Sequence, residues 1–157
     1  CRTMNDRPDA PNHLDPPMPA DGDRSARAAS LRSRAAVHAG DRAAWLALFR
    51  DDAVVQDPVG PSPLDESGEG HSGKEAIGAF WDTVIAPNPV HMELRGSRAG
   101  GHEVANELTI TTTFPDGSKA AVDVVAIYLV DDRGLIGSLR AFWEFDSLRI
   151  TPADQNG

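Results

Sequence analysis

The chain has 157 residues and a formal net charge of −9. This length suits one domain with a buried core, and the negative charge argues against a nucleic acid or an anionic membrane surface as partner. The sequence has no apolar run near the ~20 residues of a membrane span and no secretory signal pattern. The single cysteine, Cys1, excludes an internal disulfide framework and a cysteine-based zinc site. We therefore expect an acidic, soluble, cytoplasmic domain.

Residues 1–22 differ in composition from everything that follows. Prolines stand at positions 8, 11, 16, 17 and 19 among aspartates, and large apolar residues are few. Such a segment buries too little apolar surface to offset the entropy lost on folding. We predict a flexible arm over residues 1–22, a folded domain over residues 23–150 and a short tail over residues 151–157.

Two helices are predicted at the start of the domain. Asp23 is a suitable N-cap for a helix that runs to about His38, where a glycine follows that is typical of a helix end. Asp41 then caps a second, shorter helix that carries Trp45 and Phe49.

A short apolar strand from Val54 ends in a carboxylate, Asp57. Pro58 favours an extended conformation for the residue before it, and Gly60 completes a turn. Asp57 is open to two interpretations. It either begins a turn in water, as aspartate before proline often does, or it lies at the mouth of an apolar cavity. In the cavity, burial raises the pKa of the carboxyl, as a general base for a carbon acid requires.

Residues 60–73 are a loop by composition, and a helix follows. Ser72 and Glu75 match a capping box, and Phe80 and Trp81 lie on the apolar stripe of this helix. The glycines before it have the spacing of a phosphate-binding loop. However, Glu75 stands where that motif needs Ser or Thr, so we expect no nucleotide cofactor.

The second half of the domain predicts β-strands over residues 90–94, 104–114, 120–130 and 135–145, with a hairpin turn at residues 115–117. The strand over residues 120–130 is apolar on both faces, which predicts the core on one face and a second subunit on the other. Helices followed by antiparallel strands indicate an α+β domain. We predict a cone-shaped, curved antiparallel sheet packed by the N-terminal helices around an apolar pocket.

The candidate chemistry narrows to one carboxylate. The five histidines lack the spacing of metal ligands, so we predict no metal site, and no motif of a covalent nucleophile is present. Aromatic residues taken singly are usually core. Together with Asp57, they describe a general base in an apolar pocket. These aromatic residues are Phe49, Phe80, Trp81, Tyr128, Phe142 and Trp143.

Four segments resemble the bacterial ketosteroid isomerases of the NTF2-like, SnoaL-like superfamily: residues 45–60, 71–81, 104–107 and 138–143. The resemblance covers roughly residues 30–146 and implies the cone-shaped fold and a homodimer. It implies that Asp57 is the base that removes an acidic proton next to a carbonyl, as in the family's known mechanism. It also implies that Phe80, Trp81 and Trp143 line the substrate pocket.

The chain departs from the family at both oxyanion-hole donors. The family's tyrosine falls on Ser33, and its protonated aspartic acid falls on Ala126. Losing one such donor typically costs roughly 2.7–4 kcal/mol of barrier, so losing both predicts a poor steroid isomerase. Asp123 lies on the opposite strand face from Ala126 and is no substitute. Ser33 is a weak donor, and Tyr128 shares the face of Ala126.

The chain keeps the base Asp57 but lacks the family's two oxyanion-hole donors. We therefore expect it to catalyse a different reaction from that of the steroid isomerases. We predict a cofactor-independent cyclase or isomerase of bacterial secondary metabolism, acting on a large apolar, polyketide-derived substrate and forming a homodimer through the sheet face. The alternatives are a steroid Δ5-3-ketone isomerase with a rebuilt oxyanion hole and a non-catalytic module that binds a hydrophobic ligand. The predicted catalytic residues are Asp57, Ser33, Tyr128 and Glu144, and the predicted substrate-binding residues are Phe49, Phe80, Trp81, Leu108, Ala126 and Trp143.

Overall fold

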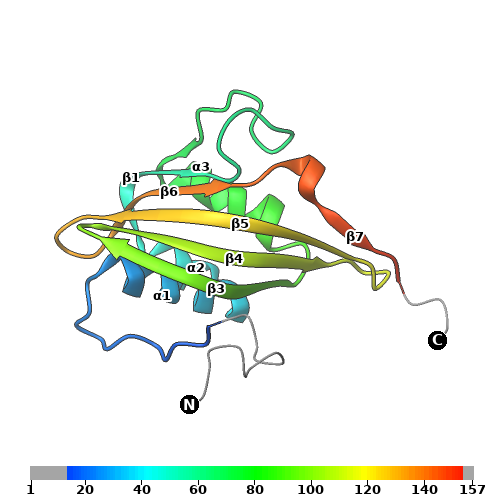
Figure 1. Ribbon diagram of the computed structural model, residues 1–157. Coiled ribbons are helices and arrows are strands. Elements are labelled where there is room, and N and C mark those ends of the chain that lie inside the picture. The colour runs from blue at the N-terminus through cyan, green and yellow to red at the C-terminus, as the bar shows by residue number, and fades with distance from the viewer. Residues whose placement is uncertain (1–13, 154–157) are drawn as a thin grey trace, which may run out of the picture.

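The computed structural model describes residues 14–153 (Figure 1). A long curved sheet forms one layer, and helices α1 (Ala26–Ala39), α2 (Arg42–Leu46) and α3 (Gly73–Phe80) lie against one of its faces. This arrangement confirms the predicted α+β architecture. The outer parts of the predicted arm and tail, residues 1–13 and 154–157, lie outside the described residues. No helix within residues 14–153 is both long and apolar enough to span a membrane.

The first two helices form close to the predicted positions. Helix α1 (Ala26–Ala39) is capped by Ser25, whose hydroxyl accepts a hydrogen bond from the Ala28 amide at 3.1 Å. The predicted cap, Asp23, instead accepts from the Ser25 amide at 2.9 Å. Helix α2 (Arg42–Leu46) is capped by Asp41, as predicted. It ends before Phe49, which begins strand β1 (Phe49–Gln56).

The third helical segment is interrupted by a change of winding. Strand β2 (His71–Ser72) leads into α3 (Gly73–Phe80), and a π-helical stretch, η1 (Trp81–Ile85), continues it. Ser72 is the N-cap residue, but its side chain makes no capping hydrogen bond. The position of the helix start was therefore predicted correctly from the sequence, whereas the capping box was not.

Of the four strands predicted in the second half, the first is longer than predicted, the second and third lie close to their predicted positions, and the fourth is shorter because it ends at Phe142. They are β3 (Val90–Gly100), β4 (Glu103–Thr113), β5 (Lys119–Val130) and β6 (Ile136–Phe142). The sheet order is β2-β1-β6-β5-β4-β3, and only β1 and β6 run parallel. A 3₁₀ turn, η2 (Phe145–Ser147), leads to β7 (Arg149–Thr151), which pairs with β5.

Strand β5 separates the two faces of the sheet by simple alternation. Val124, Ala126 and Tyr128 point inward and are buried against the helices. Val125 and Leu129 point outward and remain 39% and 40% exposed. The residues described thus bury only one of the two apolar faces that the sequence predicted to be covered. Asp123 also points outward, where Thr109 and Arg149 hydrogen-bond to its carboxylate, and it is therefore remote from the inner face.

Helix α1 is fastened to the edge of the sheet at Met92. The Arg34 guanidinium donates to the Met92 carbonyl at 2.7 Å, and the Met92 amide donates to His38 Nε2 at 2.9 Å. His91 stacks on His38 with ring centroids 5.0 Å apart. Burial lowers the pKa of His38, consistent with a neutral ring that accepts this hydrogen bond. These contacts hold the helix over the inner face of β3.

Candidate active site

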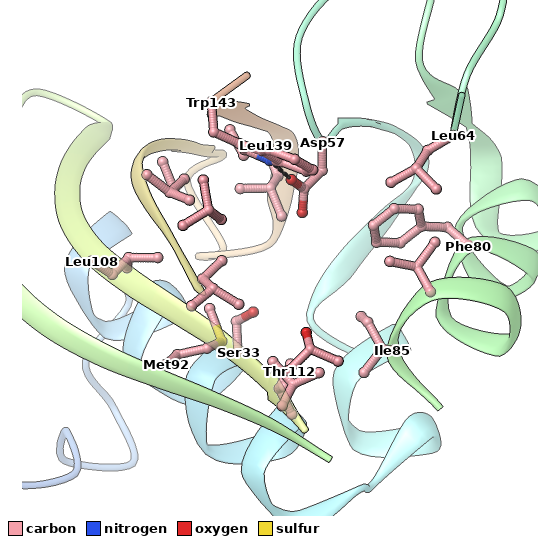
Figure 2. A pocket seen from close by; sticks show the side chains of 18 of the residues that line it. Ser33, Asp57, Leu64, Phe80, Ile85, Met92, Leu108, Thr112, Leu139 and Trp143 are labelled. Atoms are coloured by element: carbon pink, nitrogen blue, oxygen red, sulfur yellow. Dashed lines mark hydrogen bonds between the residues drawn. The ribbon is translucent and has the colours of Figure 1, made fainter. Parts of the chain in front are cut away.

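A cavity of about 340 Å³ lies between the inner face of the sheet and the helices. Its walls are mostly apolar, and its polar groups are few (Figure 2). Strands β4 and β5 supply alternate residues such as Leu108 and Val124, and Phe80 and Ile85 close the helical side. Leu64 contributes from the loop after β1. A mostly apolar cavity with a few convergent polar groups is typical of a site for a small apolar molecule.

Asp57 lies immediately after β1, where the chain leaves the sheet. Two residues on, the Val59 amide donates to the Ala141 carbonyl of β6 at 2.9 Å, which fixes the position of this turn. The Trp143 indole Nε1 donates to Asp57 Oδ1 at 2.6 Å. Figure 2 shows the other carboxylate oxygen pointing into the cavity. One oxygen is therefore held by the protein, and the other is directed toward a ligand.

The environment of Asp57 alters its acidity. Burial raises the pKa of this carboxyl to about 6, and the hydrogen bond from Trp143 opposes that rise because it favours the charged form. The side chain is half-buried and keeps a surface toward the cavity that it lines. A carboxyl with a pKa near 6 is mostly ionised at neutral pH, yet it holds a proton better than an ordinary aspartate. Both properties are required of a general base that must later return its proton.

A second polar cluster surrounds Ser33, which α1 places against the cavity. Ser33 Oγ accepts a hydrogen bond from Trp45 Nε1 at 3.0 Å and one from the Tyr128 hydroxyl at 3.3 Å. These two donors occupy both lone pairs of the serine oxygen. The hydroxyl proton of Ser33 is not used in these two hydrogen bonds, so it can be donated to a ligand in the cavity.

Tyr128 remains a neutral donor in this setting. Burial raises the pKa of its hydroxyl to about 12, and the nearby Asp57 carboxylate acts in the same direction. Its phenol reaches Ser33 from β5, across the inner face of the sheet. The residues predicted as substitute donors, Ser33 and Tyr128, are thus in contact, and both line the cavity.

The structure brings together seven of the predicted site residues along the cavity wall: Asp57, Ser33, Tyr128, Phe80, Leu108, Ala126 and Trp143.

Three of the predicted site residues do not line this cavity. Phe49 packs edge-on against Trp45, with ring centroids 4.7 Å apart, and Trp81 tilts against the same indole at 5.2 Å. Both rings are buried in a layer behind the wall, where they support Trp45. Glu144 is exposed because the chain is extended after Trp143, so consecutive side chains point to opposite sides.

The cavity also contains residues that the sequence analysis did not assign to the site. Thr112 shares a strand face with Leu108, and the alternation of β4 is a signal that would have found it. Asn88 and Leu64 come from irregular segments, for which no periodic signal exists. Within residues 14–153, no three side chains of His, Cys, Asp or Glu gather into a group that would hold a metal ion.

Residues 31–138 match the model of the SnoaL-like domain family. The chain belongs to this family. It falls in the ketosteroid isomerase-like branch of the NTF2-like superfamily. The steroid Delta-isomerase of Nocardioides simplex is 33% identical to the SnoaL-like chain over 127 residues, which are 81% of this chain and 96% of the relative.

Solved structures agree with this placement. The Delta 5-3-ketosteroid isomerase from Mycobacterium sp. superposes with a TM-score of 0.77 and 42% identity, covering 80% of the SnoaL-like chain and 98% of the relative. A Mycobacterium tuberculosis protein in complex with estradiol-17beta-hemisuccinate gives a TM-score of 0.75 and 38% identity, covering 79% of this chain and 97% of that one. A computationally designed 17-OHP binder is 36% identical, with a TM-score of 0.77 and coverage of 80% and 96%. An epoxide hydrolase/cyclase-like enzyme of pyran ring formation shares the fold at 22% identity, a TM-score of 0.69 and coverage of 80% and 95%.

Proposed function

We propose that this protein is a cofactor-independent isomerase that moves a proton next to the carbonyl of a large, polycyclic, apolar ketone. The observation that carries the proposal is Asp57. One oxygen of its carboxylate is held by Trp143 at 2.6 Å, the other faces an apolar cavity, and its pKa lies near 6. This combination of position and acidity fits a general base for a carbon acid.

In the proposed reaction, Asp57 removes a proton from the carbon between a ketone and an isolated double bond. The electron pair of that C–H bond moves toward the carbonyl, and a dienolate forms with its charge on oxygen. Asp57, now protonated, returns the proton to the far end of the dienolate. The product is a conjugated enone, and the carboxylate is regenerated, so atoms and charge balance over the cycle.

Ser33 is the group proposed to stabilise the dienolate oxygen. Its oxygen accepts hydrogen bonds from Trp45 and Tyr128, which polarise its O–H bond and direct the proton elsewhere. The phenol that the family places on α1 would therefore act from β5, through the serine. Ala126 supplies no donor, so this oxyanion hole is weaker than one made by a tyrosine and an aspartic acid.

The relatives support a steroid-like substrate. Two are named as isomerases acting on steroids, and two others are described with a bound steroid derivative or as a binder of one. These four share 33–42% identity with the chain. The apolar cavity of about 340 Å³ is consistent with such a molecule.

Cyclisation of a polyketide-derived substrate is the second candidate function. The observation that favours it is Ala126, because the absent donor removes transition-state stabilisation that a fast steroid isomerase needs. In that case Asp57 would generate a carbanion that closes a ring, and the cavity would fold the substrate. For either reaction we also propose a homodimer through the outward sheet face, where Val125, Leu129 and Phe142 are each about 40% exposed.

Turnover of a Δ5-3-ketosteroid, followed by the ultraviolet absorbance of its conjugated product, tests the proposal. The wild type should convert the steroid, and Asp57→Asn should lower kcat by about a thousandfold, within the usual range for loss of a general base. Asp123→Asn, an outward aspartate on β5, is the matched control and should retain activity. A wild type that binds the steroid without converting it would exclude the isomerase. Cyclisation and ligand binding would then be the functions left to test.

A further inference from the structure

Most of the polar side chains that line the cavity fall into two sets. The first set contains Asp57, Ser33, Tyr128 and Trp143, which the proposed reaction uses. The second set contains Thr112 and Asn88, to which the reaction assigns no role. Between the two sets the floor of the cavity is apolar, formed by the inward residues Val122, Val124, Leu108 and Ile110.

The pairing of the strands separates the two sets along the sheet. Ala126 pairs with Ala141 of β6, whose carbonyl holds the turn that carries Asp57. Thr112 pairs with Ala120, six residues from Ala126 along β5. At roughly 3.3 Å per residue, Ala126 and Ala120 are about 20 Å apart along the strand. Ser33 lies between these ends, because Arg34, the next residue on α1, donates to the carbonyl of Met92, which pairs with Ile110, two residues from Thr112. The second set therefore lies toward the far end of an elongated cavity.

Thr112 and Asn88 have hydrogen-bonding capacity that the protein does not use. Thr112 points inward from β4, and Figure 2 shows it in the lower part of the cavity. Within residues 14–153, neither the Thr112 hydroxyl nor the side-chain amide of Asn88 has a hydrogen-bond partner. Thr83 also lines the cavity but differs, because its hydroxyl donates to the Ala79 carbonyl at 2.8 Å.

The two side chains are held near one another by the edge of the sheet. Val90, two residues after Asn88, pairs with Thr112, and the Thr113 amide donates to the Pro89 carbonyl at 3.0 Å. A proline lies on each side of Asn88, at positions 87 and 89, which limits the freedom of its backbone. The segment that carries Asn88 is therefore fixed beside Thr112.

We propose that Thr112 and Asn88 form a second polar subsite, which binds an oxygen substituent at the end of the substrate remote from the reacting carbonyl. This inference rests on the proposed function, and it narrows the substrate class to elongated apolar ketones with a hydroxyl or a second carbonyl at the opposite end. A ligand without that oxygen would leave both side chains unpaired when it displaces water. The loss of those hydrogen bonds is the physical basis of the discrimination.

Calorimetric titration with a matched pair of ligands tests the subsite. Both are conjugated steroid 3-ketones, which are not isomerised further; one carries a hydroxyl at C17 and the other carries hydrogen there. The measured quantity is the ratio of their dissociation constants for the wild type, Thr112→Val, Asn88→Ala and the control Thr111→Val. Thr111 has the same chemistry but is the next residue on β4, where side chains point to the opposite face.

The preference for the hydroxylated ketone should fall about three- to tenfold in Thr112→Val and in Asn88→Ala, because each removes one neutral hydrogen bond, and it should persist in Thr111→Val. An unchanged ratio in both cavity variants would overturn the subsite and leave the isomerase proposal intact. If the ratio of dissociation constants falls in the cavity variants but the wild type does not convert the Δ5-3-ketosteroid, the isomerase proposal is refuted and the subsite is supported. A wild type that binds neither ketone would overturn both.

Discussion

Ser33 accepts two hydrogen bonds and has one proton left to donate. The family position for a strong phenolic donor therefore holds a weaker hydroxyl, whose strength depends on the residues behind it. Phe49 and Trp81 support the serine indirectly, because they pack against Trp45 and hold its indole toward Ser33.

Ser33→Ala should lower kcat for a ketone substrate by about a hundredfold, the lower end of the effect of losing an oxyanion-hole donor. KM should change little, because the hydrogen bond strengthens as charge develops on the oxygen. Ser30→Ala is the matched control. Ser30 is also buried on α1 and accepts from Asn106 Nδ2 at 2.9 Å, but it does not line the cavity. Equal losses of kcat in the two variants would argue that Ser33 acts only through the fold.

The loop between β1 and β2 is the element that closes the cavity beside Asp57. Leu64 enters the cavity from this loop, and Asp65 holds the loop together. The Asp65 carboxylate accepts from the Gly70 amide at 2.7 Å and from the Ser67 hydroxyl at 2.9 Å. Gly70 has a φ of 92°, and a Cβ there would approach Val54 to 2.8 Å. The loop is therefore tied closely to β1.

Asp65→Ala should free this loop and raise KM about three- to tenfold, with little change in kcat, because it removes hydrogen bonds that hold Leu64 in place. Steady-state kinetics measure both constants. Asp131→Ala is the control, since Asp131 makes similar bonds to the Arg133 and Leu135 amides in the β5–β6 turn, outside the cavity. A fall in kcat with unchanged KM would show that the loop serves the chemistry and not substrate binding.

The sequence predicts helices and strands better than it predicts which side chains contact one another. Local signals located α1, α2 and the long strands, and alternation in β5 correctly separated Asp123 from Ala126. The hydrogen bond between Asp57 and Trp143 joins residues 86 positions apart, and the one between Ser33 and Tyr128 spans 95. No local pattern encodes such pairs. The resemblance to a family pointed to Asp57 and Trp143 as site residues and also located the departures at Ser33 and Ala126, but the hydrogen-bond partners of Ser33 required the folded chain.

For the protein as a whole, the buried carboxylate of Asp57 lowers the free energy of unfolding at neutral pH. The folded chain keeps the Asp57 proton up to about pH 6, whereas an ordinary aspartate releases it near 3.8. Because the pKa of Asp57 is higher in the folded state, proton binding to this carboxyl stabilises the folded protein. This stabilisation is fully present below pH 3.8 and is lost as the pH rises through 6. The native protein therefore retains a charged, half-buried carboxylate at neutral pH, as the proposed function requires.

Asp57→Asn should raise the free energy of unfolding at about pH 7.5 by roughly 2 kcal/mol relative to the wild type, and the difference should shrink toward about pH 4. The amide oxygen of asparagine still accepts the Trp143 hydrogen bond. Urea denaturation at both pH values measures the effect. Asp123→Asn should show no such gain, because Thr109 and Arg149 hold the pKa of Asp123 below its ordinary value. A variant less stable than the wild type at pH 7.5 would contradict the account of Asp57.

The pH dependence of kcat/KM for a Δ5-3-ketosteroid tests most directly whether Asp57 is the base. The wild-type value should rise tenfold per pH unit below about pH 6 and become level above it, because only the ionised carboxylate removes the proton. Trp143→Phe should move this limb to higher pH, since it removes the hydrogen bond that favours the charged form. A flat wild-type profile, or a limb near pH 6 that persists in Asp57→Asn, would assign the base to another residue.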